Sequence, residues 1–172
     1  RWKMFFRKYW SRPLARILFT VIALGFGPAL AQAATIVALG ASNTFGKGVA
    51  RNEAYPAQLQ AILKSSGKSV RVINAGINGD TTEGMLRRLD RAVPNGTSLV
   101  ILQPGGNDRR KGTPDRTSEI QSRLSARGIP VIMMSNSMLS GLPHQADGVH
   151  LTPEGYAMLA KSIAPSVQGA MR

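Results

Sequence analysis

Four short, predominantly apolar runs separated by helical patterns are the feature that most narrows the folds open to this chain. The runs are Thr35–Leu39, Val70–Ile73, Ser98–Leu102 and Pro130–Met134. Strands that lack a regular alternation of polar and apolar residues are typical of a parallel sheet with both faces buried. The sequence therefore predicts an α/β fold of three layers, α/β/α and flavodoxin-like in class, with a parallel sheet of four to five strands.

The expected helices carry apolar residues at helical spacing and end at glycine or proline. They span Tyr55–Ser66, Glu83–Val93, Arg116–Ala126 and Pro153 to about Val167. Thr152 is placed to cap the last of them, since Pro153 and Glu154 follow it in the first turn. Strands and helices thus alternate through one domain.

The first 33 residues are expected to form a secretory signal peptide and not to belong to the fold. Basic residues between Arg7 and Arg16 precede an apolar run of 14 residues, Ile17–Leu30, and then Ala31-Gln32-Ala33. A basic region, an apolar region and an A-x-A site are the parts of such a signal. The run is shorter than the roughly 20 residues that span a membrane, although a retained anchor is the alternative. We expect one domain over residues 34–172, periplasmic or secreted, with no stable membrane span after cleavage.

Part of the positive charge lies in the expected signal segment. The whole chain has a formal net charge of +13, but residues 1–33 hold six of its 22 lysines and arginines and none of its nine acidic residues. The remaining 16 basic and nine acidic residues give a net charge of +7. No basic helix interleaved with aromatic residues is evident, so no nucleic-acid partner is expected. The absence of cysteine excludes a cysteine nucleophile and thiolate metal sites.

Four polar motifs stand at the ends of predicted elements. They are GASN at 40–43, GINGD at 76–80, GGND at 105–108 and DGVH at 147–150. The first three come shortly after predicted strands, and functional residues of α/β sheets lie beyond the carboxyl ends of the strands. The fourth precedes the last predicted helix. We therefore expect the motifs to meet at one edge of the sheet.

The residue types in these motifs are those that nucleophilic acyl transfer requires. Ser42 is the candidate nucleophile, and a serine hydroxyl needs a neighbouring base. His150 is the candidate base, and Asp147 stands three residues before it to orient the imidazole. The backbone N–H groups of Ser42 and Gly79 and the side-chain amide of Asn107 are candidate oxyanion donors. Taken singly, each motif also fits an ordinary turn or helix cap.

In their order along the chain the motifs resemble those of the SGNH (GDSL-like) hydrolases, over most of residues 35–165. The closest likeness is to bacterial periplasmic acyl-thioesterase and lysophospholipase-type esterases. The resemblance implies Ser42 as nucleophile, His150 as base and Asp147 as its orienting carboxylate. It implies Gly79 and Asn107, with Ser42, as the oxyanion donors. It further implies a five-stranded parallel sheet and no metal or organic cofactor.

Two departures from that family pattern stand out. Ala41 occupies a position that is commonly aspartate in the family signature, and we expect this to affect loop geometry more than chemistry. Only 42 residues separate Asn107 from His150, fewer than is usual in relatives of this type. This leaves little room for a fifth strand and for part of an acyl-binding wall.

The sequence as a whole predicts an exported serine ester hydrolase that cleaves a small acyl ester or thioester through an acyl-serine intermediate. A carbohydrate O-deacetylase using the same residues is one alternative, and a non-catalytic SGNH-like binding protein is another. The basic run from Arg109 to Lys111 is interpreted first as a solvated loop, with attraction of anionic head groups or acidic esters as the second interpretation. The sequence predicts no particular oligomeric state.

Overall fold

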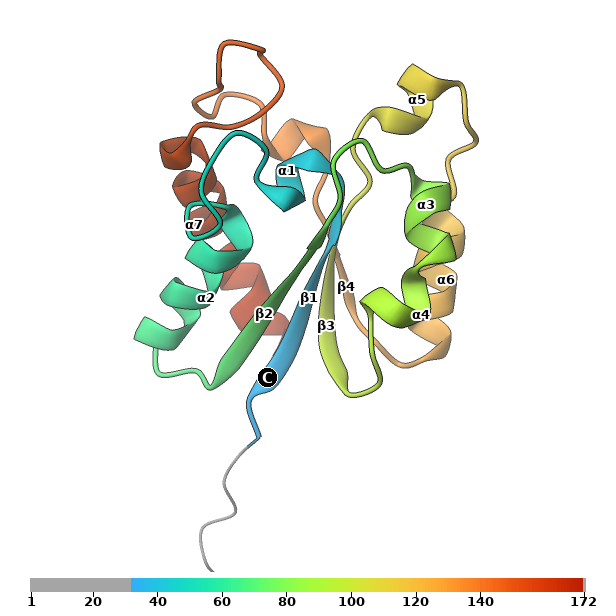
Figure 1. The fold of residues 1–172 in the computed structure, drawn as a ribbon. Coiled ribbons are helices and arrows are strands. Elements are labelled where there is room, and N and C mark those ends of the chain that lie inside the picture. Colours follow the sequence, from blue (N-terminus) through green and yellow to red (C-terminus); the bar gives the residue numbers. More distant parts are fainter. Residues whose placement is uncertain (1–31, 172) are drawn as a thin grey trace, which may run out of the picture. The chain divides into compact units, whose positions relative to one another are not determined.

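A computed structural model describes residues 32–171 (Figure 1). The expected signal segment, residues 1–33, lies almost entirely outside these residues. Four strands form one parallel sheet with the order β2-β1-β3-β4. They are β1 (Ala34–Gly40), β2 (Val70–Gly76), β3 (Thr97–Gln103) and β4 (Val131–Met133).

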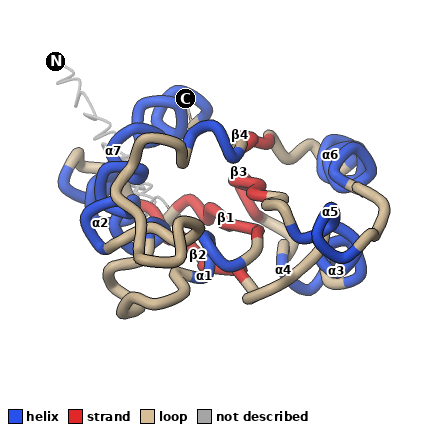
Figure 2. The backbone as a smooth tube through the Cα atoms, turned by 90° about the horizontal axis from the view of Figure 1, so that it is seen from above, coloured by secondary structure: helices blue, strands red, loops and turns tan. Residues whose placement is uncertain are grey.

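Helices cover both faces of this sheet, as Figures 1 and 2 show. On one face lie α2 (Tyr55–Ser65) and α7 (Pro153–Ala170), and on the other lie α3 (Thr82–Arg87), α4 (Leu89–Ala92) and α6 (Thr117–Ala126). Ile36 and Ala38 of β1 pack in the core beneath α2 and α7, while Val37 and Leu39 pack beneath the other helices. All four side chains are fully buried, which explains why this strand shows no polar alternation. The predicted three-layer α/β fold is confirmed.

The sheet differs from the family expectation in its number of strands. Among residues 32–171 it has four strands, and β4 forms one of its two edges. The expectation of a fifth strand, implied by the resemblance, is therefore wrong for this part of the chain. After β4 the chain makes a short 3-10 turn, η1 (Asn136–Met138), and an isolated bridge joins His144 to Leu151. The segment leads directly to the DGVH motif, so no length remains for another helix and strand.

Two details of the helices also differ from the sequence prediction. The helix expected over Glu83–Val93 is divided at Arg88 into α3 and α4. The division coincides with the turn of the Arg88 side chain toward Asp80 and the Gly40 carbonyl. The last helix ends at Ala170 and not near Val167.

Two short helices form where loops were expected, at the carboxyl ends of β1 and β3. They are α1 (Ser42–Phe45) and α5 (Asn107–Lys111), and both lie at the edge seen from above in Figure 2. Helices of four or five residues are too short to display an apolar periodicity, so the sequence pattern did not reveal them. No helix within residues 32–171 combines the length and the apolar character needed to cross a membrane.

Candidate active site

Ser42 begins α1 directly after β1, and the residue is buried, with 8% of its surface exposed. The end of β2 passes so close to α1 that a Cβ at Gly76 would lie 2.2 Å from the Phe45 nitrogen. Only glycine permits this approach.

As the first helical residue, Ser42 has a backbone N–H without an intrahelical partner, and no acceptor in the described chain is bonded to it. That N–H is therefore free to meet a ligand.

His150 lies between Ser42 and Asp147, although 108 positions separate it from the serine. Its Nε2 is 2.9 Å from Ser42 Oγ, and its Nδ1 is 2.5 Å from Asp147 Oδ2. Asp147 Oδ1 accepts hydrogen bonds from the backbone N–H groups of Val149 and His150, both at 2.9 Å. The structure thus brings the three predicted residues into one line of contacts that can carry a proton away from the serine hydroxyl.

The Asp147 carboxylate is strongly stabilised in its ionised form. The backbone N–H of His150, the His150 side chain and the backbone N–H of Val149 hold the pKa of Asp147 well below its usual range. Hydrogen bonds to a carboxylate favour its charged state, and this group receives three. The side chain beside His150 Nδ1 is therefore a negatively charged acceptor, which suits it to stabilise an imidazolium.

The loop that carries His150 is held by the residue next to the nucleophile. Asn43 Nδ2 donates to the Val149 carbonyl at 3.1 Å, and the Tyr156 hydroxyl donates to Asn43 Oδ1 at 3.0 Å. Burial raises the pKa of Tyr156 to about 12, so its phenol keeps the proton that it donates. The distance between Ser42 and His150 thus depends on the buried amide of Asn43.

The candidate oxyanion donors lie on the neighbouring loop and on α5. Asn107 is 3% exposed, and its Nδ2 donates to the Asp80 carbonyl at 2.7 Å while its Oδ1 accepts from the Arg110 guanidinium. An amide nitrogen has two hydrogens, so one remains for a ligand. Gly79 adopts φ +71°, a left-handed conformation that favours glycine, and its carbonyl accepts from Lys111 Nζ at 2.6 Å. Its own N–H has no partner among residues 32–171.

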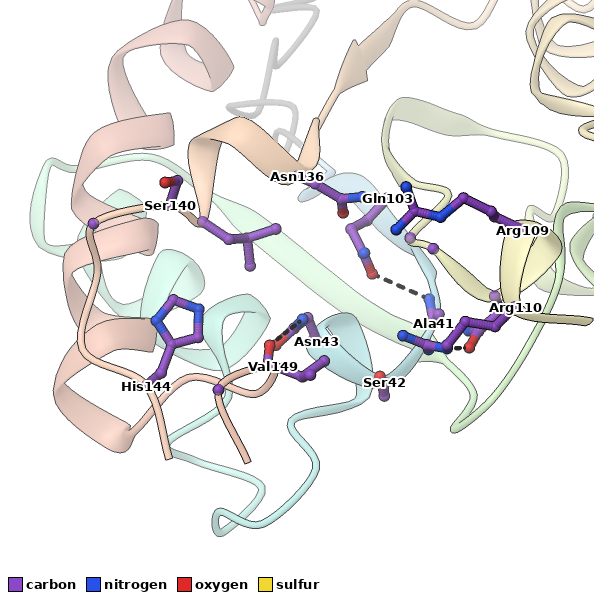
Figure 3. Close-up of a pocket in the computed structure, with 16 residues that line it drawn as sticks. Ala41, Ser42, Asn43, Gln103, Arg109, Arg110, Asn136, Ser140, His144 and Val149 are labelled. Atoms are coloured by element: carbon purple, nitrogen blue, oxygen red, sulfur yellow. Dashed lines mark hydrogen bonds between the residues drawn. The ribbon is translucent and has the colours of Figure 1, made fainter. Parts of the chain in front are cut away.

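A cavity of about 360 Å³ opens beside the nucleophile (Figure 3). Ser42 and Asn107 both line it, whereas Gly79 lies outside its wall. Further wall residues are Gln103 and the two arginines of α5, Arg109 and Arg110. No group of three or more metal-ligating side chains occurs in the described part of the chain. The nucleophile and hydrogen-bond donors thus face one cavity, while His150 contacts Ser42 from outside its wall.

Several polar residues that the sequence analysis left without a role connect the motif loops. Arg88 Nε donates to Asp80 Oδ2 at 2.9 Å, and the same guanidinium donates to the Gly40 carbonyl at 3.2 Å. The side chains of this ion pair are each 11% exposed. Both carboxylate oxygens of Asp108 accept from the Thr82 N–H at 3.1 Å. Asp80 and Asp108 belong to two of the glycine-rich motifs, so the sequence could have marked them as residues of the site. No local pattern in the sequence marks Arg88.

Comparisons with known proteins give related matches. Residues 38–143 match the model of the GDSL-like lipase/acylhydrolase family, a match that ends before Asp147 and His150. An arylesterase of Vibrio mimicus is 30% identical over 127 residues, or 70% of this chain and 64% of the relative. Esterase TesA of Pseudomonas aeruginosa is 34% identical over 113 residues, or 65% of this chain and 55% of the relative. The chain thus spans less than two thirds of either relative.

Among solved structures, AlinE4, an SGNH-hydrolase family esterase, is similar with a TM-score of 0.61 and 26% sequence identity. The similarity covers 84% of this chain and 100% of that one.

Proposed function

Since the chain belongs to the GDSL-like lipase/acylhydrolase family, we propose that it hydrolyses acyl esters or thioesters through an acyl-serine intermediate. The observation that carries the proposal is the line of contacts from Asp147 through His150 to Ser42. The names of the two curated relatives, an arylesterase and an esterase, support an ester bond as the target. The substrate we expect is a small acyl ester or thioester.

Acylation in this proposal begins at Ser42. His150 Nε2, at 2.9 Å, accepts the hydroxyl proton while Oγ attacks the carbonyl carbon. The imidazolium that forms donates its Nδ1–H to the Asp147 carboxylate and is stabilised by that negative charge. The N–H groups of Ser42 and Gly79 and the free amide hydrogen of Asn107 donate to the oxyanion. His150 then protonates the departing alcohol or thiol, and the acyl group remains on Ser42.

In deacylation, His150 and the oxyanion donors act again, with a water molecule as the attacking group and Ser42 as the leaving group. A water molecule takes the place of the departed alcohol, and His150 removes its proton as the oxygen attacks the acyl carbon. The same donors stabilise the second oxyanion. The imidazolium returns its proton to Ser42 Oγ, so the carboxylic acid leaves and the serine is restored.

Replacing Asn107 by alanine is expected to lower kcat about 10²–10³-fold, because one oxyanion donor is lost in the transition state. KM should change little, since the ground-state carbonyl carries less charge. Asn107 also holds the Asp80 carbonyl, so the melting temperature of the variant must be measured beside its kinetics. Asn95→Ala, at an exposed loop position, is the matched control. Activity within a few-fold of the wild type would contradict the role given to Asn107.

The direct test of the proposed function is hydrolysis of a series of p-nitrophenyl esters, from C2 to C16, by the purified protein. Release of p-nitrophenol above the spontaneous rate is the expected result. A preference for the acetyl ester would favour the carbohydrate O-deacetylase alternative, and a preference for longer chains would favour a lipid or thioester substrate. No release by protein that is folded by circular dichroism would contradict the proposal and favour a non-catalytic binding protein.

Export to the periplasm or beyond the cell belongs to the same proposal. It rests on the basic stretch, the apolar run and the A-x-A site within residues 1–33.

A further inference from the structure

Three consecutive basic residues of α5 follow the candidate oxyanion donor Asn107, and their side chains are engaged differently. Lys111 Nζ donates to the Gly79 carbonyl, and the Arg110 guanidinium donates to Asn107 Oδ1. Both therefore hold groups that belong to the proposed oxyanion site. Arg109 forms no hydrogen bond or ion pair with any described residue. All three residues are exposed, as expected for a solvated segment, but two of them support the site and the third has no partner among the described residues.

Arg109 and Arg110 line the same cavity as Ser42. In Figure 3 both side chains extend from α5 toward the part of the cavity where Ala41 and Gln103 lie. Asn136 lies next to Gln103 in that view, and the other side of the cavity offers the polar side chains of Ser140 and His144. No aspartate or glutamate belongs to the wall in the described part of the chain. The space next to the nucleophile is therefore positively charged.

The acidic residues of the motifs do not neutralise this charge, because each has partners of its own. Asp80 is paired with Arg88, Asp108 accepts from backbone and hydroxyl donors, and Asp147 is bonded to the loop and ring of the candidate base. A guanidinium presents several N–H donors in a planar fork that matches a carboxylate or a phosphate. A free guanidinium beside a nucleophile is suited to hold an anionic part of the substrate.

We propose that the substrate is an ester that bears a negatively charged group, and that Arg109 binds this group while Ser42 attacks the ester carbonyl. The inference rests on the proposed ester hydrolysis and specifies the substrate class of that site. Water cleaves the ester into an acid and an alcohol, so the anionic group belongs either to the acyl part or to the leaving group. Arg110, on the same wall, adds to the positive field at the anion.

The test compares each anionic ester with its own neutral methyl ester. Mono-p-nitrophenyl adipate and its methyl ester carry the variable group on the acyl part. The butyrate ester of 4-(carboxymethyl)phenol and its methyl ester carry it on the leaving group. Within each pair the scissile bond is the same, and the methylene spacers keep its reactivity nearly equal. Initial rates with the full protein give kcat/KM for the four esters at low and high salt.

We expect kcat/KM to be about five-fold higher for the anion than for its methyl ester in one of the two pairs, mainly through a lower KM. The preference should shrink as salt rises, because a part-exposed ion pair is screened. Arg109→Gln should lower kcat/KM for the anion to about that of its methyl ester, and Arg109→Lys should restore part of the preference. Arg91→Gln removes an exposed charge on α4 and should keep the preference.

Three outcomes overturn the inference, and they differ in what they imply for the proposed function. Hydrolysis of all four esters with no preference for the anion in either pair would overturn the anionic substrate and leave the proposed function standing. A preference that Arg109→Gln and Arg91→Gln reduce equally would attribute it to the overall charge of the protein and overturn the role of Arg109. Hydrolysis of none of the esters would overturn the proposed function and the inference together.

Discussion

Substitution of Ser42 by alanine is expected to lower kcat for p-nitrophenyl ester hydrolysis by about 10⁴–10⁶-fold. The variant has no oxygen that can form the acyl intermediate, so only transition-state binding by the remaining donors persists. KM should change little, because the hydroxyl contributes mainly to the chemical step. The fold should survive, since the partner of Ser42 Oγ is His150 Nε2 and the substitution removes a single small atom.

The measurement for this prediction is the p-nitrophenol release rate of purified Ser42→Ala beside the wild type, with circular dichroism and melting temperature recorded for both. Ser166→Ala, at an exposed position of α7, is the matched control and should keep full activity. A Ser42→Ala protein that retains more than about a tenth of the wild-type rate would remove Ser42 from the mechanism.

The second large effect is expected at Asp147, where replacement by asparagine should lower kcat by about 10³–10⁴-fold. An asparagine oxygen can still accept the backbone N–H groups of Val149 and His150, so the loop should keep its shape. Its amide nitrogen, however, is a donor facing His150 Nδ1. The imidazole must then carry its proton on Nε2, which can no longer accept the proton of Ser42.

The pH dependence of kcat, measured for the wild type and for Asp147→Asn, gives a further check on the role of Asp147. The pKa of its carboxyl is lowered, so the wild-type carboxylate remains ionised as pH falls to about 5 and continues to stabilise the imidazolium. The defect of Asp147→Asn should therefore persist throughout the range from about pH 5 to pH 8. Asp90→Asn, at a side chain 94% exposed, serves as control. A loss of less than ten-fold would indicate that His150 works without this carboxylate.

The fold was largely predictable because the signals for it are local. The apolar runs of β1 and β3 reveal strands buried on both faces, and glycine or proline after the predicted helices marks their ends. The deviations arise where local pattern is weak. Helices as short as α1 and α5 contain too few residues for a periodicity, and the division at Arg88 involves contacts with Asp80 and the Gly40 carbonyl that lie outside the helix.

The candidate site was predictable in its residues more than in its contacts. The four motifs indicate a nucleophile, a base and donors because acyl transfer needs those chemical groups. Nothing in the spacing indicates that Asn43 holds the His150 loop through the Val149 carbonyl, or that Tyr156 orients that amide. Such contacts join positions more than 100 residues apart, and a hydrogen bond between distant segments leaves no periodic trace in the sequence.

The local pattern of apolar and polar residues was thus sufficient to predict the parallel α/β layers. Alternating strands and helices whose strands are buried on both faces have few other ways to pack. Chain length after Asn107 was sufficient to indicate that a fifth strand has little room. Only the folded chain decides that His150 Nε2 stands 2.9 Å from Ser42 Oγ, because that distance depends on how the start of α1 meets the loop before α7. It also decides which cation of α5 is free, since Arg110 and Lys111 find their acceptors on other segments while Arg109 finds none in the described chain.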